Sequence, residues 1–371
     1  MHSSFYVDMR LTVLVLWLFV AAGHPASLVA QISEASADAG WVALKQGNGN
    51  AAAAAFDAAL KQRPDDALLH YGAGVAAYLQ GRRGDAADSL TRALTLNPQL
   101  IPATALLGEI EYLQGHLDAA IERYEAALAG AARPDSTLQQ RLDDWRKEAS
   151  LNRTLTTSSS ARVAVTFNGR TDSALAAHVE GVLDRAFYRI AENIGANPPN
   201  RVLVTLYTEQ QFRDITRGPA WAAGSFDGKV RVPVKGVSQD RDDLDRVLVH
   251  ELSHAIVHGL APQGVPAWLH EGLARYFEPA DVAAAQRRVI ASGVVMPFAQ
   301  LQDGFSRFDA RTASAAYDQS LVAVDLLART LGTRTATLLR ALGRGQSFRE
   351  AMGRVGLVAA DFEEQVLRRL R

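Results

Sequence analysis

The chain has 371 residues, a length that predicts two domains, and its 39 Lys and Arg nearly balance its 40 Asp and Glu. Because the net charge is only -1 and no long basic run occurs, we expect no nucleic-acid partner. The absence of cysteine excludes disulfide scaffolds, thiolate metal sites and cysteine nucleophiles, whereas nine histidines remain available as ligands.

Residues 1–30 have the pattern of a secretory signal peptide. Arg10 precedes the apolar run 11–22, and the residues up to Ala30 offer a cleavage site before Gln31. The run is too short for a comfortable membrane span, and an uncleaved anchor is the alternative. We therefore predict an exported protein, periplasmic or secreted, that is cleaved near Ala30 and has no stable membrane span afterwards.

Residues 31–150 contain an internal repeat. Four series of residues recur every 34 positions in the same phase, and prolines end the first two units. This register resembles tetratricopeptide repeats, each of which is a pair of antiparallel helices. The resemblance implies an all-α solenoid of three repeats, whose concave groove binds a segment of a protein partner or which simply supports the next domain. The series are Gly40, Gly74 and Gly108; Ala52, Ala86 and Ala120; Phe56, Leu90 and Tyr124; and Ala59, Ala93 and Ala127, with Pro64 and Pro98 after the first two units.

Residues 161–371 are predicted as a second domain, after a polar, Ser/Thr-rich linker at 151–160. The order strand, helix, strand, hairpin and then helices favours an α+β fold. The hairpin is predicted over 224–234, because Asp227-Gly228 is a strong turn pair and valines alternate after it. Strands are expected near 163–167 and 202–207, with an amphipathic helix at 173–193.

An H-E-x-x-H motif extends from His250 to His254. On a helix, residues i and i+4 lie on one face, so both imidazoles can reach one ion. Glu271 follows a loop broken by Gly and Pro, and its carboxylate is well placed to be a third ligand. Two histidines and one carboxylate leave the fourth zinc position open to water, as in catalytic rather than structural sites. Glu251 is the predicted general base beside that water.

Two nearby histidines do not fit the same ion. His258 lies eight residues after His250, or about 12 Å along a helix, which is too far for one ion. His270 is adjacent to Glu271 but points about 100° away around the helix. We therefore predict that His270 lies on the surface or in packing and is not a ligand.

The stretch that follows the motif contains Trp268, Glu271, Gly272 and Ala274 in a Trp-x-x-Glu-Gly-x-Ala run. Together with H-E-x-x-H, this run resembles the gluzincins, zinc peptidases whose glutamate ligand lies on the helix after the motif. The likeness is greatest to the bacterial peptidase MA-like family. It extends over about residues 160–371, and its specific motifs lie within about 30 residues of that range.

The resemblance implies a thermolysin-like (gluzincin) metalloprotease domain that acts on a peptide or protein. It implies Zn²⁺ as the cofactor, His250, His254 and Glu271 as its ligands, and Glu251 as the general base. It also implies that the strand before the zinc helix is a sheet edge that pairs with extended substrate, with an ordinary hairpin as the alternative. The Gly-x-Met-Glu-Asn element of related aminopeptidases is absent, which favours an endopeptidase.

The run 316–320 resembles the Tyr-x-x-Ser element of the same family. It implies Tyr317 as a hydrogen-bond donor to the oxyanion that forms on the scissile carbonyl, and a packed core tyrosine is the alternative. Metal-bound imidazoles usually donate their second N–H to an outer partner, for which we expect Asp318 or Glu278.

The sequence thus predicts an exported zinc peptidase with Glu251 as general base. The alternative is an exported, repeat-based interaction or assembly factor with an inactive or vestigial metalloprotease domain. A purely structural zinc is a third interpretation, which the three-ligand set disfavours because structural sites usually have four protein ligands.

Overall fold

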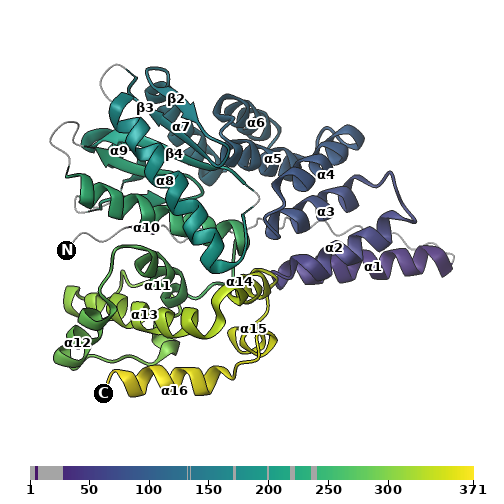
Figure 1. The fold of residues 1–371 in the computed structure, drawn as a ribbon. Helices are drawn as coiled ribbons and strands as arrows, with labels where there is room; N and C mark the ends of the chain where they lie inside the picture. Colours follow the sequence, from purple (N-terminus) through teal and green to yellow (C-terminus); the bar gives the residue numbers. More distant parts are fainter. Residues whose placement is uncertain are drawn as a thin grey trace. The chain divides into compact units, whose positions relative to one another are not determined.

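The computed structural model describes residues 5–6, 28–131, 133, 135–169, 173–198, 200–217, 222–234 and 240–371 (Figure 1). Most of the predicted signal peptide, 1–30, lies outside these residues. Contacts divide the described chain into two compact units, here called the repeat unit (28–150) and the sheet unit (5–6 and 151–371). No helix in the described ranges combines the length and the apolar character that a membrane crossing requires.

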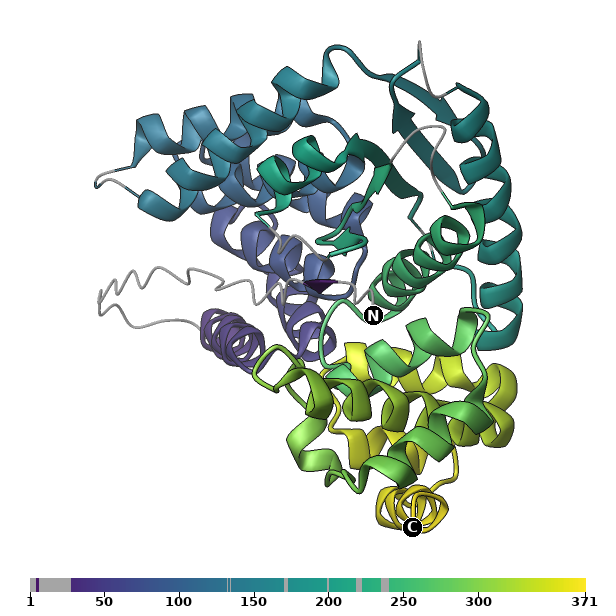
Figure 2. The ribbon, with the colours of Figure 1, turned by 90° about the vertical axis from the view of Figure 1, so that its left-hand side faces the viewer.

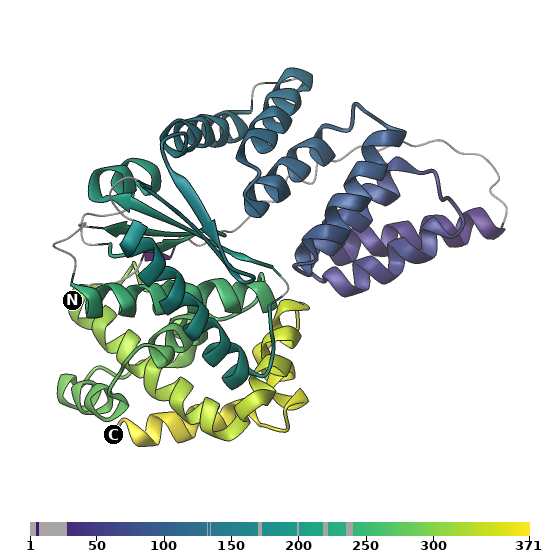
Figure 3. The same cartoon turned by 45° about the horizontal axis from the view of Figure 1, so that its top comes forward.

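The repeat unit is built from antiparallel helix pairs, as the 34-residue period predicts, and Figure 3 shows them in purple to blue. In every pair the recurring glycine faces the recurring large residue. A Cβ on Gly74 would lie 2.8 Å from Leu90, and one on Gly108 would lie 2.8 Å from Tyr124. Glycine therefore sets how closely each pair packs. The pairs are α1 (Leu28–Lys45) with α2 (Gly49–Leu60), α3 (Ala67–Leu79) with α4 (Arg83–Leu96), and α5 (Ile101–Gln114) with α6 (Leu117–Gly130).

A further helix, α7 (Ser136–Asn152), packs against the last pair. Its buried Trp145 stacks on Tyr112 with ring centroids 4.6 Å apart, and the Tyr124 ring lies 4.2 Å from the same indole. Arg141 makes a two-pronged hydrogen bond to Glu109 on α5. These contacts cover the apolar end that the third pair would otherwise expose.

The sheet unit contains a six-stranded mixed sheet with the order β1-β5-β6-β4-β3-β2. Strands β3, β4 and β6 are parallel, whereas β2 and β5 run antiparallel to their neighbours β3 and β6. One apolar core joins the buried side chains of this sheet to the helices of the unit. The strands are β1 (Phe5–Tyr6), β2 (Thr156–Ser159), β3 (Val163–Phe167), β4 (Val202–Thr208), β5 (Ser225–Phe226) and β6 (Val230–Val234).

Helix α10 (Arg241–Leu260) contacts β4, β5 and β6 on one side and α11 and α14 on the other (Figure 1). Figure 2 shows the helices of the C-terminal part, green to yellow, gathered together on that other side. The predicted α+β class with an all-α repeat array is confirmed. The remaining elements are α8 (Ser173–Ile194), α9 (Glu209–Thr216), α11 (Ala267–Phe277), α12 (Val282–Ser292), η2 (Phe298–Leu301), α13 (Ala310–Leu331), η3 (Gly332–Arg334), α14 (Thr335–Gly343), α15 (Phe348–Arg354) and α16 (Ala359–Arg369).

Two sequence predictions differ from this topology. The segment 151–160, predicted as a linker, contains β2, because its threonines and serines suit a half-solvated edge strand. The hairpin at 224–234 forms as predicted, but β6, the strand before α10, is not a sheet edge. The turn at Asp227-Gly228 folds β5 back onto β6, so β6 lies between β4 and β5.

Candidate metal centre

Helix α10 begins where the acidic residues predict, and it carries both histidines of the motif. The side chain of Asp240 accepts hydrogen bonds from the backbone N–H groups of Asp242 and Asp243, which caps the helix. The helix then continues without interruption to Leu260. His250 and His254 therefore project from one face, one turn apart.

Helix α11 brings the carboxylate of Glu271 to the two histidines. Its next residue, Gly272, faces α13 so closely that an added Cβ would lie 2.5 Å from the carbonyl oxygen of Ser320 and 2.6 Å from Val324. Only glycine permits this approach, since real Cβ contacts are longer. Gly272 thus allows α11 to pack closely against α13. Glu271, the residue before it, faces α10.

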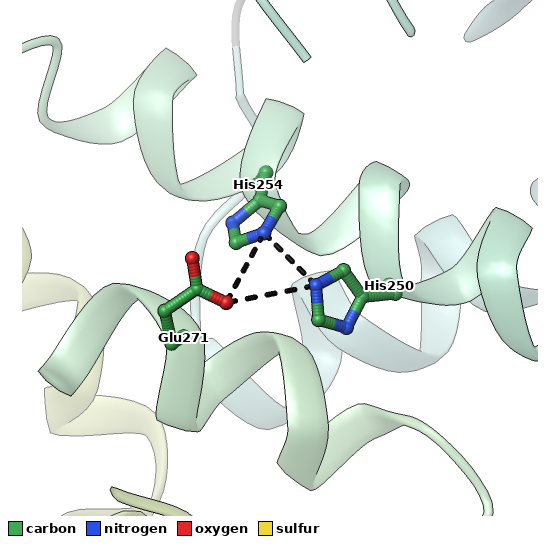
Figure 4. A group of neighbouring side chains, drawn as sticks. All are labelled: His250, His254 and Glu271. Atoms are coloured by element: carbon green, nitrogen blue, oxygen red, sulfur yellow. Dashed lines mark hydrogen bonds and ion pairs between the residues drawn. The ribbon is translucent and has the colours of Figure 1, made fainter. Parts of the chain in front are cut away.

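The structure brings His250, His254 and Glu271 together (Figure 4). The Nε2 atoms of the two histidines are 3.1 Å apart, and Oε2 of Glu271 lies 3.7 Å from Nε2 of His250 and 3.8 Å from Nε2 of His254. In a tetrahedral zinc site with ligand bonds of about 2.0–2.2 Å, neighbouring ligand atoms are about 3.3–3.6 Å apart. The triangle is therefore of the size that one zinc ion needs.

The donor set also fits zinc chemically. All three side chains are buried, and Oε2 of Glu271 has no hydrogen-bond partner among the described residues. A buried carboxylate oxygen without a partner is costly unless a cation compensates it. Burial, the largest cause, raises the pKa of Glu271 to about 7. Imidazole nitrogens and a carboxylate oxygen are common zinc ligands, so these residues can hold the ion.

His250 has a charged outer partner. Its Nδ1 donates to Oε1 of Glu278 at 2.5 Å, and Arg246 and Arg275 lie 3.5 Å and 3.9 Å from the other oxygen of that carboxylate. Burial disfavours protonation of His250, but the hydrogen bond and charge of Glu278 outweigh it, so the pKa of His250 is raised. Of the two outer partners that the sequence suggested, Glu278 is the one that contacts a histidine of the three-residue cluster.

His254 has a second imidazole as its outer partner. Nδ1 of His254 lies 2.6 Å from Nδ1 of His270, and the two rings are nearly parallel, with centroids 4.6 Å apart. Burial, together with the charges of His258 and His250, lowers the pKa of His270 to about 3. The sequence prediction left His270 on the surface or in packing; it is buried, and it contacts a proposed ligand.

Glu251 is fully buried on the same helix, directly after His250. Gly224, just before β5, lies against its carboxylate: an added Cβ would be 2.6 Å from Oε1 of Glu251. His258 stays outside the three-residue cluster, as expected, and its ring packs against Phe226 with centroids 5.4 Å apart.

Tyr317 and Asp318 lie on α13. The half-buried Tyr317 packs its ring edge-on against Phe305 at 5.0 Å. Asp318 accepts hydrogen bonds of 2.7 and 2.6 Å from Arg288, and it lies 3.7 Å from Arg275. Asp318 thus belongs to a network of arginines, and the expectation that it orients an imidazole is not met.

Sequence reasoning missed the roles of Gly224 and His270. His270 lies outside the cluster of His250, His254 and Glu271, but on α11 every residue from Trp268 to Ala274 is buried, so both faces of the helix contact other elements. That apolar run of Trp268, Leu269, Gly272, Leu273 and Ala274 around the pair was the available signal. No local sequence pattern predicted the contact between Gly224 and Glu251.

Comparisons with known proteins agree with this architecture. A family model described as the peptidase MA superfamily matches residues 182–364, and one described as a tetratricopeptide repeat matches residues 37–101. Among curated proteins no match is found.

Similar solved structures include a tetratricopeptide repeat domain of Spaghetti (RPAP3) bound to an HSP90 peptide, with 18% identity and a TM-score of 0.31 over 32% of this chain and 94% of that one. The TPR2B domain of yeast Sti1, in complex with pHsp70, has 17% identity and a TM-score of 0.30 over 33% and 98% of the two chains. The P58(IPK) repeat domain has 15% identity and a TM-score of 0.28 over 91% and 77%.

Proposed function

Because the chain joins tetratricopeptide repeats to a peptidase MA superfamily domain, we propose that it is a zinc-dependent peptidase that cleaves within peptide or protein chains. The observation that carries this proposal is the buried triangle of His250, His254 and Glu271, with Glu251 on the same helix. Three ligands, rather than the four of structural sites, support a catalytic centre.

When bound by these three side chains, zinc would polarise the scissile carbonyl and make water more acidic. Among the side chains, Glu251 is the one that we propose transfers protons in the reaction. Its carboxylate accepts a proton from the attacking water and later donates that proton to the leaving amine. Gly224 limits the movement of this carboxylate on the side of β5.

Tyr317 is our proposed donor to the oxyanion, through its phenolic O–H. Its edge-on contact with Phe305 holds the ring plane while leaving the residue half-exposed. The preference for internal cleavage follows from the absent Gly-x-Met-Glu-Asn element, since that element supplies the usual carboxylate for a free amino terminus in the related aminopeptidases.

The repeat unit supports a second role, in which its helices bind a protein segment that is either a substrate or a partner. We place the protein outside the cytoplasm, in the periplasm or the medium, on the basis of the apolar run at 11–22. The rival function is an interaction or assembly factor with an inactive peptidase domain, and the same repeat unit favours it. Under this rival function, replacing Glu251 would not change any activity of the protein.

The test measures bound zinc per chain and cleavage of a denatured protein, with and without chelator, for the wild type, Glu251→Gln and His254→Ala. We expect about one zinc in the wild type and in Glu251→Gln, and chelator-sensitive cleavage in the wild type alone. Loss of the general base should slow cleavage by roughly 10²- to 10⁴-fold. His254→Ala should lose the metal, because two ligands remain.

Undiminished hydrolysis by Glu251→Gln would rule out the proposed mechanism. Stoichiometric zinc without any cleavage of denatured or native proteins would favour the assembly factor.

A further inference from the structure

The two histidines of the metal centre have outer partners of different charge. Nδ1 of His250 donates to the carboxylate of Glu278, whereas Nδ1 of His254 faces Nδ1 of His270 at 2.6 Å. Both histidines direct Nε2 towards Glu271 (Figure 4). The centre therefore has two different outer partners, a carboxylate at His250 and the buried imidazole of His270 at His254.

We propose that His270 is the positioning residue of the metal centre: its Nδ1 accepts a hydrogen bond from Nδ1–H of His254 and so holds the lone pair of Nε2 towards the ion. This inference rests on the proposed zinc site and adds a residue to it. His270 itself does not touch the ion or the substrate.

The direction of the hydrogen bond follows from the chemistry of imidazole. A neutral ring carries one N–H, and a nitrogen that binds a metal must offer its lone pair. Because Nε2 of His254 faces the other two ligand atoms, its proton has to be on Nδ1 when zinc is bound. At 2.6 Å only one proton fits between the rings, so Nδ1 of His270 is the acceptor and the proton of His270 is on Nε2.

Packing holds His270 in this position. The plane of its ring is 20° from that of His254, as an in-plane hydrogen bond between the ring edges requires, and the side chain is buried. Its helix, α11, is fixed against α13 by the close approach at Gly272. The dipeptide His270-Glu271 thus contacts His254 from two sides, because Glu271 faces Nε2 while His270 faces Nδ1.

The outer partner of His254 differs in kind from the carboxylates that surround it. Glu278 brings a negative charge that Arg246 and Arg275 partly balance, and Glu271 and Glu251 bring two more. A second outer carboxylate at position 270 would add another negative charge, whereas an imidazole fixes the tautomer of His254 without one. Outer partners of this kind typically change metal affinity by about 10- to 100-fold when removed.

The experiment compares His270→Phe, which keeps a planar ring without an acceptor, with His270→Asn, whose Oδ1 occupies roughly the place of Nδ1. His116→Phe is the matched control, because it removes an exposed imidazole from the repeat unit. Zinc affinity is measured by competition with a chelator on the full chain, and circular dichroism of the metal-free proteins verifies folding. Nitrogen-15 spectra of the zinc-loaded wild type identify which ring nitrogen of each histidine carries the proton.

We expect His270→Phe to bind zinc about 10- to 100-fold more weakly, His270→Asn to recover most of that loss, and His116→Phe to match the wild type. The spectra should place the proton of His254 on Nδ1 and that of His270 on Nε2. Wild-type affinity in a folded His270→Phe, equal losses in Phe and Asn variants, or a proton on Nδ1 of His270 would each overturn the inference.

These readouts separate the inference from the proposed peptidase. A chain that binds zinc in a His270-dependent way but cleaves nothing supports the inference and contradicts the peptidase. If the wild type cleaves proteins and His270→Phe binds zinc as tightly as the wild type, the peptidase is supported and the inference is contradicted. A wild type that takes up no zinc overturns both.

Discussion

Gly224 lies directly against the carboxylate of Glu251, so that a Cβ on Gly224 would be 2.6 Å from Oε1 and 2.8 Å from Cγ of Glu251. Real Cβ atoms essentially never come that close to another heavy atom. The two residues are 27 positions apart, and the contact depends on the hairpin of β5 and β6 lying beside α10. The backbone before β5 therefore bounds the space around the carboxylate of Glu251, our proposed general base.

Gly224→Ala should slow cleavage while leaving zinc content unchanged, because the three atoms nearest to the new methyl group all belong to Glu251, which is not one of the proposed ligands. A displacement of about 1 Å in a reacting group can cost about 10²-fold in rate. Steady-state kinetics and metal analysis measure both quantities. Gly181→Ala on α8 is the control, since its Cβ would meet only the flexible end of Arg185, at 3.3 Å. Full activity in Gly224→Ala would contradict the inference that Gly224 fixes the position of the Glu251 carboxylate.

Tyr317→Phe should lower kcat by about 10²-fold with little change in KM, because the phenolic O–H acts on the oxyanion and not on the bound substrate. The ring itself is retained, and so is its contact with Phe305. Comparison with Phe305→Leu, which alters only the packing, separates the two effects. If Tyr317→Phe keeps its kcat, Tyr317 is a packed core tyrosine.

Zinc affinity should rise with pH up to slightly alkaline conditions. The pKa of His250 is raised, because the hydrogen bond and charge of Glu278 outweigh burial, and burial raises the pKa of Glu271 to about 7. Raised pKa values mean that both groups carry protons at lower pH, and each proton must leave before the group can bind the ion. The pKa of His254 is instead lowered, mainly by burial, so this residue releases no proton.

Chelator competition over a range of about pH 6 to 8 measures this dependence, with roughly tenfold change per pH unit for each proton displaced. Glu278→Gln removes the charge that raises the pKa of His250 and should flatten the curve. A zinc affinity that is constant over this range would contradict the assignment of His250 and Glu271 as ligands.

Trp145→Ala should destabilise the repeat unit by about 3–5 kcal/mol, because it removes a buried indole that stacks on Tyr112 and contacts Tyr124. Denaturant unfolding of the full chain, followed by circular dichroism, measures the shift of the transition assigned to the repeats. Trp145→Phe keeps part of the stack and should cost less. An unchanged transition in Trp145→Ala would mean that α7 does not stabilise the third pair.

Local sequence patterns were sufficient where a structure depends on neighbours in the chain. The spacing of His250 and His254 and the acidic start near Asp242 predicted α10 and the shared face of its two histidines. Asp227-Gly228 predicted the hairpin. The recurrence of Gly74 and Leu90 predicted the helix pairs, since each repeat must fit its own two helices together.

Packing between segments that are distant in sequence decided which side chains contact His250 and His254, which the local patterns did not predict. Glu278 and Asp318 are both carboxylates within reach by sequence, but the end of α11 places Glu278 at His250, whereas arginines pair with Asp318. His270 was predicted to lie on the surface or in packing. Because α11 is buried on both faces, His270 contacts His254.

The sequence by itself determined the zinc-motif helix, the hairpin, the repeat register and the shared face of His250 and His254, because spacing along a regular element sets which side chains share a face. Only the tertiary structure decided that β6 lies inside the sheet, that Gly224 faces Glu251 and that His270 contacts His254. Such contacts join segments whose separation in sequence carries no periodic signal, and they arise from close packing among β5, α10, α11 and α13.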